Sequence, residues 1–82
     1  MVRYCIIDNE AVTRLQLRAT IYKLRPNYSC VGEADDLLGL SQCLAKCPNL
    51  LIVNSQLSDG TVYTVLKHDE NRTPVIITSD YV

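Results

Sequence analysis

Polar side chains that could bind a cation or accept a phosphoryl group follow three short apolar runs of the chain. These residues are Asp8, Asn9 and Glu10 after the first run, Asn54 after the second, and Ser79 and Asp80 after the third. Carboxylate oxygens bind Mg²⁺ and attack phosphorus, whereas a carboxamide is a neutral ligand and a poor nucleophile. These residues are therefore the first candidates for a functional site.

The four cysteines allow a metal site, a disulfide set or reduced thiols. Three of Cys5, Cys30, Cys43 and Cys47 lie within otherwise apolar patterns, which favours reduced and buried thiols. A zinc site would use a C-x2-C pair or clustered histidines, whereas Cys43 and Cys47 are four positions apart and His68 is the only histidine. We therefore predict free thiols without a bound metal.

Short apolar runs alternate with longer segments that have helical spacing. Strands are predicted at residues 4–7, 28–34, 50–53 and 74–78, and helices at 11–25, after Asp35 or Asp36 up to the Cys47-Pro48 pair, and around 62–66. The turn Ser58-Asp59-Gly60 follows the third strand, and Asp59 is expected to be a turn residue. The order β-α-β-α-β-α-β predicts a single α/β domain.

This element order predicts a parallel sheet with right-handed crossovers and helices on both faces. Ligands of such sheets bind beyond the carboxyl ends of the strands, which is where the polar residues named above fall. The first loop, DNEAVT, contains no glycine that would let the backbone hold a phosphate. A flavin- or nucleotide-binding domain of the same topology is therefore disfavoured.

Three segments resemble the receiver domains of bacterial response regulators. IIDNE is similar to their VDDE, LLIVNSQLSDG to LVLLDLxLPDG, with Ser58 where proline is usual, and TPVIITS to PVIxxTA. The interval of 25 residues from Asn54 to Ser79 resembles that of receivers attached to LytTR DNA-binding domains. The resemblance covers the whole chain. It implies a flavodoxin-like, doubly wound sheet with strand order 2-1-3-4, in which residues 1–82 form one receiver-like domain, incomplete at the C-terminus because the fifth strand is absent.

The resemblance also implies roles for single residues. Asp8 and Asn9 fall on the acidic pair that holds Mg²⁺, Asn54 on the phosphoaccepting aspartate, and Ser79 on the hydroxyl switch residue. Two of the three expected carboxylates are thus amides, which disfavours aspartyl phosphorylation and weakens Mg²⁺ binding. Asp8 as a helix cap and Ser79 as a plain strand-end residue remain open alternatives. Glu10 would supply a second charge only if its loop turned it toward Asp8.

The first predicted helix carries apolar residues on two sides. One side holds Leu17, Ile21 and Leu24, and the other holds Val12, Leu15, Ala19 and Tyr22. The first set is expected to face the sheet. Receivers have a fifth helix beside the first, so the second set, here called the α1 stripe, is expected to be uncovered in this chain. We expect the α1 stripe to bind a second copy or another regulator.

Charge and hydropathy exclude two classes of partner for this domain. Eight basic and nine acidic residues give a net charge of −1, which argues against an electrostatic grip on nucleic acid. Its apolar runs are far shorter than the roughly 20 residues that cross a bilayer, so no membrane contact and a cytoplasmic location are expected. DNA binding would require an output domain outside these residues.

The function predicted from the sequence is a degenerate receiver of a two-component transcriptional regulator. It is expected to be no enzyme, to need no cofactor apart from weakly bound Mg²⁺, and to act by protein contact or dimerisation. A cognate histidine kinase is a candidate partner, and the chain is expected to be part of a longer regulator. The alternative is an active receiver that binds Mg²⁺ and accepts a phosphoryl group at a non-standard residue.

Overall fold

The main sheet of the protein has four parallel strands, as seen in a computed structural model that describes residues 1–78. The strands are β1 (Arg3–Ile7), β2 (Ser29–Ala34), β3 (Leu50–Asn54) and β6 (Val75–Thr78). They lie in the order β2-β1-β3-β6, with every neighbouring pair parallel. Because β6 is the fourth strand of this sheet along the chain, the predicted order 2-1-3-4 is confirmed. Residues 1–78 contain no fifth strand of this sheet.

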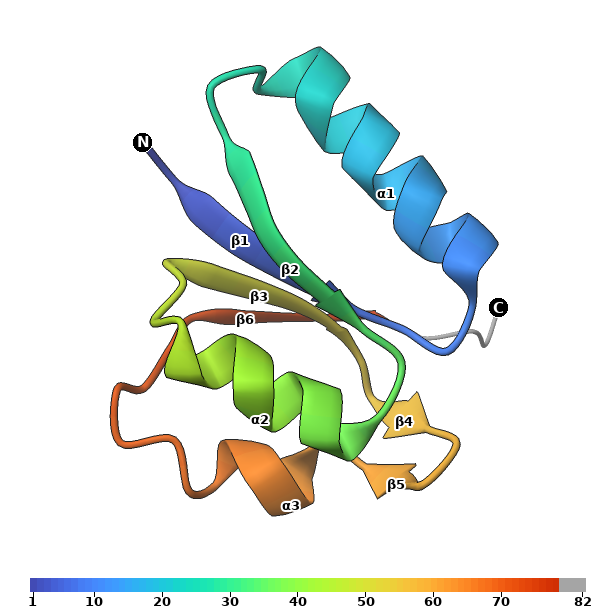
Figure 1. Ribbon diagram of the computed structural model, residues 1–82, viewed down its shortest axis with the longest axis vertical. Helices are drawn as coiled ribbons and strands as arrows, with labels where there is room; N and C mark the ends of the chain where they lie inside the picture. The colour runs from blue at the N-terminus through green and yellow to red at the C-terminus, as the bar shows by residue number, and fades with distance from the viewer. Residues whose placement is uncertain (79–82) are drawn as a thin grey trace.

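Helices cover both faces of the sheet, as the doubly wound topology requires. They are α1 (Ala11–Leu24), α2 (Leu37–Ala45) and the single turn α3 (Tyr63–Leu66). Figure 1 shows α1 on one side of the sheet and α2 and α3 together on the other. Each helix connects two parallel strands, so the α/β fold class predicted from the sequence is confirmed. No helix within residues 1–78 is long and apolar enough to cross a membrane.

A short hairpin that the sequence did not predict follows β3. Its strands are β4 (Gln56–Leu57) and β5 (Gly60–Thr61), which pair antiparallel. Asp59, at the hairpin turn, accepts the backbone N–H of Leu37 at 3.2 Å with both carboxylate oxygens. Asp59 is therefore more than the expected turn residue, because it satisfies a free N–H at the first turn of α2.

The two faces of the sheet have unequal cores. The larger core lies between the sheet and α2, whose buried residues are Leu40, Cys43 and Leu44. The smaller one consists of Tyr4, Ile6 and Ile52, with Leu17 and Ile21 of α1 packed against it. No residue of α1 is fully buried. The α1 face of the sheet is therefore the less completely covered one.

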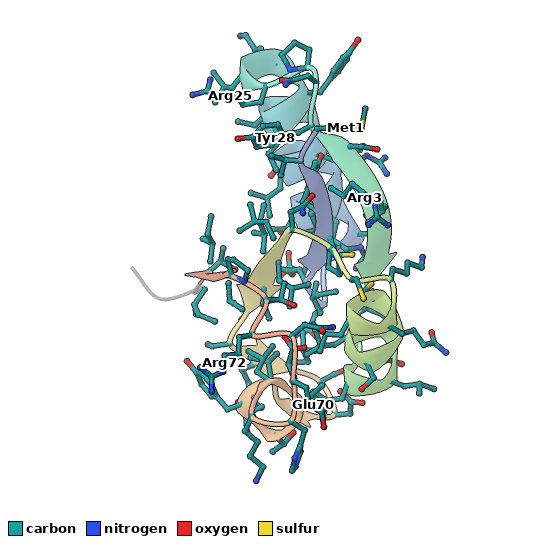
Figure 2. The ribbon with its side chains drawn as sticks, turned by 90° about the vertical axis from the view of Figure 1, so that its left-hand side faces the viewer. Met1, Arg3, Arg25, Tyr28, Glu70 and Arg72 are labelled. Carbon is teal, nitrogen blue, oxygen red and sulfur yellow. The ribbon has the colours of Figure 1, made fainter. Side chains whose placement is uncertain are left out.

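The prediction that Leu24 faces the sheet is wrong. It is 61% exposed and borders an apolar hollow of about 370 Å³ beside Ile52 and Ile76. At 100° per residue Leu24 lies on the flank of α1 that points along the sheet toward β6, where no described residue covers it. Figure 2 shows Arg25 and Tyr28, which also line this hollow, at the end of the molecule where α1 leads into β2.

The α1 stripe is exposed, as expected, but not for the expected reason. All four residues are exposed, and three of them, Leu15, Ala19 and Tyr22, border a hollow of about 450 Å³ on the β2 side of α1. The uncovered apolar surface of the sheet lies on the opposite flank of α1. A helix placed over that surface would contact Leu24 and leave the α1 stripe exposed.

Candidate functional site at the carboxyl edge of the sheet

The structure brings together the strand-end residues Asp8 and Asn54. They follow or end the adjacent strands β1 and β3, and both side chains are buried, each residue being 3% exposed. The carboxamide Nδ2 of Asn54 donates to Oδ2 of Asp8 at 3.5 Å. The predicted convergence of these two positions is thus confirmed, because the ends of neighbouring parallel strands meet at one edge of the sheet.

Asp8 is held by bonds to the start of α1 and to β2. Its Oδ1 accepts the backbone N–H of Glu10 at 2.9 Å, and its backbone carbonyl accepts Nη1 of Arg14 at 2.6 Å. Its own N–H donates to the carbonyl of Ala34 at 3.0 Å. The N-cap of α1 is Glu10, without a side-chain cap bond. The alternative in which Asp8 is the N-cap of this helix is therefore wrong.

The carboxamide of Asn54 is oriented by hydrogen bonds at both its oxygen and its nitrogen. Its Oδ1 accepts the backbone N–H of Gln56 at 3.1 Å, which directs Nδ2 toward the carboxylate of Asp8. The amide thus offers a donor where an aspartate would offer a second anionic oxygen. A buried carboxylate beside a donor is satisfied without a cation, so this pair does not fit a tightly held Mg²⁺.

Asn9 binds the hairpin. Its Oδ1 accepts the backbone N–H of Ser58 at 2.9 Å, and its Nδ2 donates to the carbonyl of Gln56 at 3.4 Å. Both ends of the exposed amide are therefore occupied by backbone groups of the β4–β5 segment. The sequence placed Asn9 correctly at this edge, but it could not show these partners because the hairpin was not predicted.

A charged cluster beside the site was missed from the sequence. Glu33 on β2 forms an ion pair with Arg14, 3.3 Å from Nε to Oε1, and a second one with Arg18. The sequence does contain an indication of this cluster, since Arg14 and Arg18 are four positions apart and thus lie on one face of α1. Because Arg14 also binds the Asp8 carbonyl, this cluster fixes the entry of α1 relative to the site.

The remaining predicted residues do not complete a metal centre in the described structure. Ser79 and Asp80 lie outside the described residues, so the switch assignment of Ser79 stays a prediction. Glu10 is exposed at the first turn of α1. Within residues 1–78 no group of three or more His, Cys, Asp or Glu side chains is placed to hold a metal ion. Asp8 is thus the only buried carboxylate among the residues that the structure describes.

Comparisons with known proteins identify the fold. No family model and no curated protein sequence matches the chain. Three similar solved structures are a LuxR-family two-component response regulator from Aurantimonas sp. SI85-9A1 (TM-score 0.87, 19% identity), the receiver (REC) domain of PhyR from Erythrobacter litoralis (0.80, 24%) and the anti-anti-sigma factor PhyR from Bartonella quintana (0.75, 23%).

The alignments span most of this chain but only part of each similar protein. They cover 100%, 98% and 93% of the chain in the order given above, and 61%, 64% and 32% of the other proteins. At these identities the likeness establishes the fold alone. The chain therefore has the α/β fold of response-regulator receiver domains.

Proposed function

We propose that this chain is a degenerate receiver domain that signals through protein contacts without aspartyl phosphorylation. The observation that carries the proposal is the carboxamide of Asn54, buried at the end of β3 and bonded to Asp8 and to the Gln56 N–H. A phosphoryl group is transferred to a receiver by attack of a carboxylate oxygen, and the side chain of Asn54 has a carboxamide in place of that carboxylate. The described neighbours of Asn54 offer one carboxylate for Mg²⁺ instead of a cluster.

The wider setting of the domain is part of the same proposal. The similar proteins include a LuxR-family regulator and an anti-anti-sigma factor, and this chain spans only part of each. A longer two-component regulator, with DNA-binding or protein-binding output, is therefore the setting we propose. The specific relationship to LytTR regulators and a cognate histidine kinase remain predictions from the sequence.

We propose that the contacts run through the α1 stripe. Val12, Leu15 and Tyr22 are each more than half exposed, and they lie along one side of one helix. Exposed apolar side chains gathered in this way favour association with another apolar surface. A second copy of the chain offers the same stripe and would form a two-fold symmetric contact.

Acetyl phosphate tests the phosphorylation part of the proposal. The native chain, the Asn54→Asp variant and the Asn9→Asp/Asn54→Asp variant are incubated with Mg²⁺ and acetyl phosphate, and their intact masses are measured. We expect no phosphoryl adduct on the native chain and an adduct on the double variant, because the variant regains the nucleophile and the acidic pair.

Two outcomes would contradict the proposal. An adduct on the native chain would favour the alternative, an active receiver with a non-standard acceptor, and peptide mapping would then locate the acceptor. An adduct on none of the three chains, with all three folded by circular dichroism, would contradict the assignment of Asn54 to the acceptor position.

A further inference from the structure

Two buried thiols from different elements meet under α2. Cys5 of β1 is 0% exposed and Cys43 of α2 is 3% exposed, and both belong to the larger core. Both sulfur atoms lie beside the same residue, Gly32 of β2. The thiols are 38 positions apart in the chain, so only the tertiary fold places them together.

Gly32 on β2 makes room for this contact. A Cβ atom at that position would lie 3.0 Å from Sγ of Cys43 and 3.3 Å from Sγ of Cys5. The register of β1 with β2 shifts next to it, so that Gly32 is the residue that pairs with Cys5. Any larger residue at position 32 would crowd both sulfur atoms.

A cation lies next to the thiol pair. Lys46 Nζ would be 3.4 Å from the same Cβ position, and it donates to the carbonyl of Val31 at 3.0 Å, which keeps it there. The hydrogen bond from Cys5, together with the Lys46 charge, outweighs burial and lowers the pKa of Cys43 to about 7. The same hydrogen bond and burial raise the pKa of Cys5. The Lys46 charge thus favours the thiolate form of Cys43.

We propose that Cys5 and Cys43 are a redox-active pair, which a hydroperoxide oxidises to an intramolecular disulfide that joins α2 to β1. The Cys43 thiolate attacks one peroxide oxygen, the O–O bond breaks, and the other oxygen leaves as an alcohol or water after taking a proton. The resulting Cys43 sulfenic acid is attacked by the Cys5 sulfur. The S–O bond breaks, and its hydroxyl leaves as water with the Cys5 proton. Two thiols lose two electrons, and one hydroperoxide gains them.

The other two cysteines are less suited to this reaction. Cys30 donates its S–H to the Gly32 carbonyl and belongs to the core on the opposite face of the sheet. Cys47 is exposed, at the end of α2, where its sulfur accepts Nδ2 of Asn71 at 3.6 Å. Neither is described in contact with a second thiol. Both can therefore be replaced without disturbing the proposed pair.

The test uses a Cys30→Ser/Cys47→Ser chain, in which Cys5 and Cys43 are the remaining thiols. After treatment with hydrogen peroxide, we expect the intact mass to fall by two hydrogen atoms and a peptide that joins Cys5 to Cys43 to appear. A thiol reductant should restore the mass. The melting temperature of the oxidised form should rise by at least about 5 °C, because the new link closes a long loop.

Matched variants distinguish disulfide formation between Cys5 and Cys43 from non-specific oxidation of the chain. Adding Cys43→Ser should abolish the mass loss, and Lys46→Met should slow it several-fold at neutral pH because it removes the charge that favours the thiolate. A folded Cys30→Ser/Cys47→Ser chain that only gains oxygen, forms disulfide-linked dimers or stays unchanged would overturn the proposal. Because that chain retains both thiols, this result does not depend on whether the Cys43→Ser variant folds.

Discussion

At the scale of single residues, the side chain at position 54 decides whether the buried carboxylate of Asp8 is stable without a bound cation. Asn54 places a donor 3.5 Å from the buried carboxylate of Asp8, so the pair is stable without a cation. A carboxylate at position 54 would instead place two buried negative charges at hydrogen-bond distance. Such a pair repels unless one member is protonated or a metal ion binds between them.

The Asn54→Asp variant is therefore expected to be less stable than the native chain in the absence of divalent metal. Repulsion with Asp8 should cost about 1–2 kcal/mol, a fall of roughly 5–10 °C in melting temperature. Mg²⁺ at millimolar concentration should restore most of this loss, while the native chain should show little response. Thermal melts with and without Mg²⁺ measure both effects.

The Asn27→Asp variant is the matched control, because Asn27 is exposed in the loop between α1 and β2, at the other end of the sheet. It should melt as the native chain does, and Mg²⁺ should not change its melting temperature. An equal Mg²⁺ response in the native and Asn54→Asp chains would show that the amide does not weaken the metal site.

At the scale of elements, α2 is attached at its first turn and along its buried side. Asp36, one of the two N-caps that the sequence left open, accepts the Gly39 N–H at 2.7 Å, and Asp59 of the hairpin accepts the Leu37 N–H. The close approach of α2 to β2 requires a glycine: a Cβ at Gly39 would lie 2.4 Å from Cβ of Ala34. Helix propensity and packing therefore oppose each other at this position.

The Gly39→Ala variant should be less stable, although alanine is the better helix former. Propensity would favour the variant by about 1 kcal/mol, whereas forcing a methyl group into an occupied site costs about 1–3 kcal/mol and also displaces the Asp36 cap. Urea unfolding should show a net loss of roughly 1 kcal/mol or more.

Ser41→Ala, at an exposed position of the same helix, serves as the reference for propensity alone. It should leave stability unchanged or raise it by a few tenths of a kcal/mol. A Gly39→Ala chain more stable than the native one would mean that α2 can move away from β2 at little cost.

At the scale of the whole molecule, the two faces of the sheet differ in how well they are covered. Two helices, α2 and α3, lie over one face of the sheet, and α1 alone lies over the other (Figure 1). The face with α2 and α3 contains the large core, whereas the face with α1 leaves an apolar hollow beside Ile76 and the α1 stripe exposed. A chain of this length buries a modest share of its surface, and contact with a second molecule would cover more. Association should therefore involve the α1 side of the molecule.

Self-association through the α1 stripe predicts a concentration-dependent mass in sedimentation equilibrium. The Leu15→Lys variant should shift the protein to the monomer and raise the dissociation constant at least about tenfold, because a charge is placed in an apolar contact. Leu38→Lys is the matched control: Leu38 is 66% exposed on α2, across the sheet. A native chain that is monomeric at all concentrations, or equal effects of the two substitutions, would contradict this interface.

The sequence by itself determined the parallel sheet and the order of its strands and the three helices along the chain, because periodicity and apolar runs are local properties that survive without knowledge of contacts. It missed the β4–β5 hairpin, and the strand order within the sheet followed from the resemblance to receivers. It also placed Asp8 and Asn54 at one edge, since that follows from parallel topology. Only the tertiary structure decided that Asn54 donates to Asp8, that Asn9 holds the hairpin, and that Leu24 is exposed. These outcomes depend on side-chain partners distant in the chain, and no local pattern specifies which donor meets which acceptor.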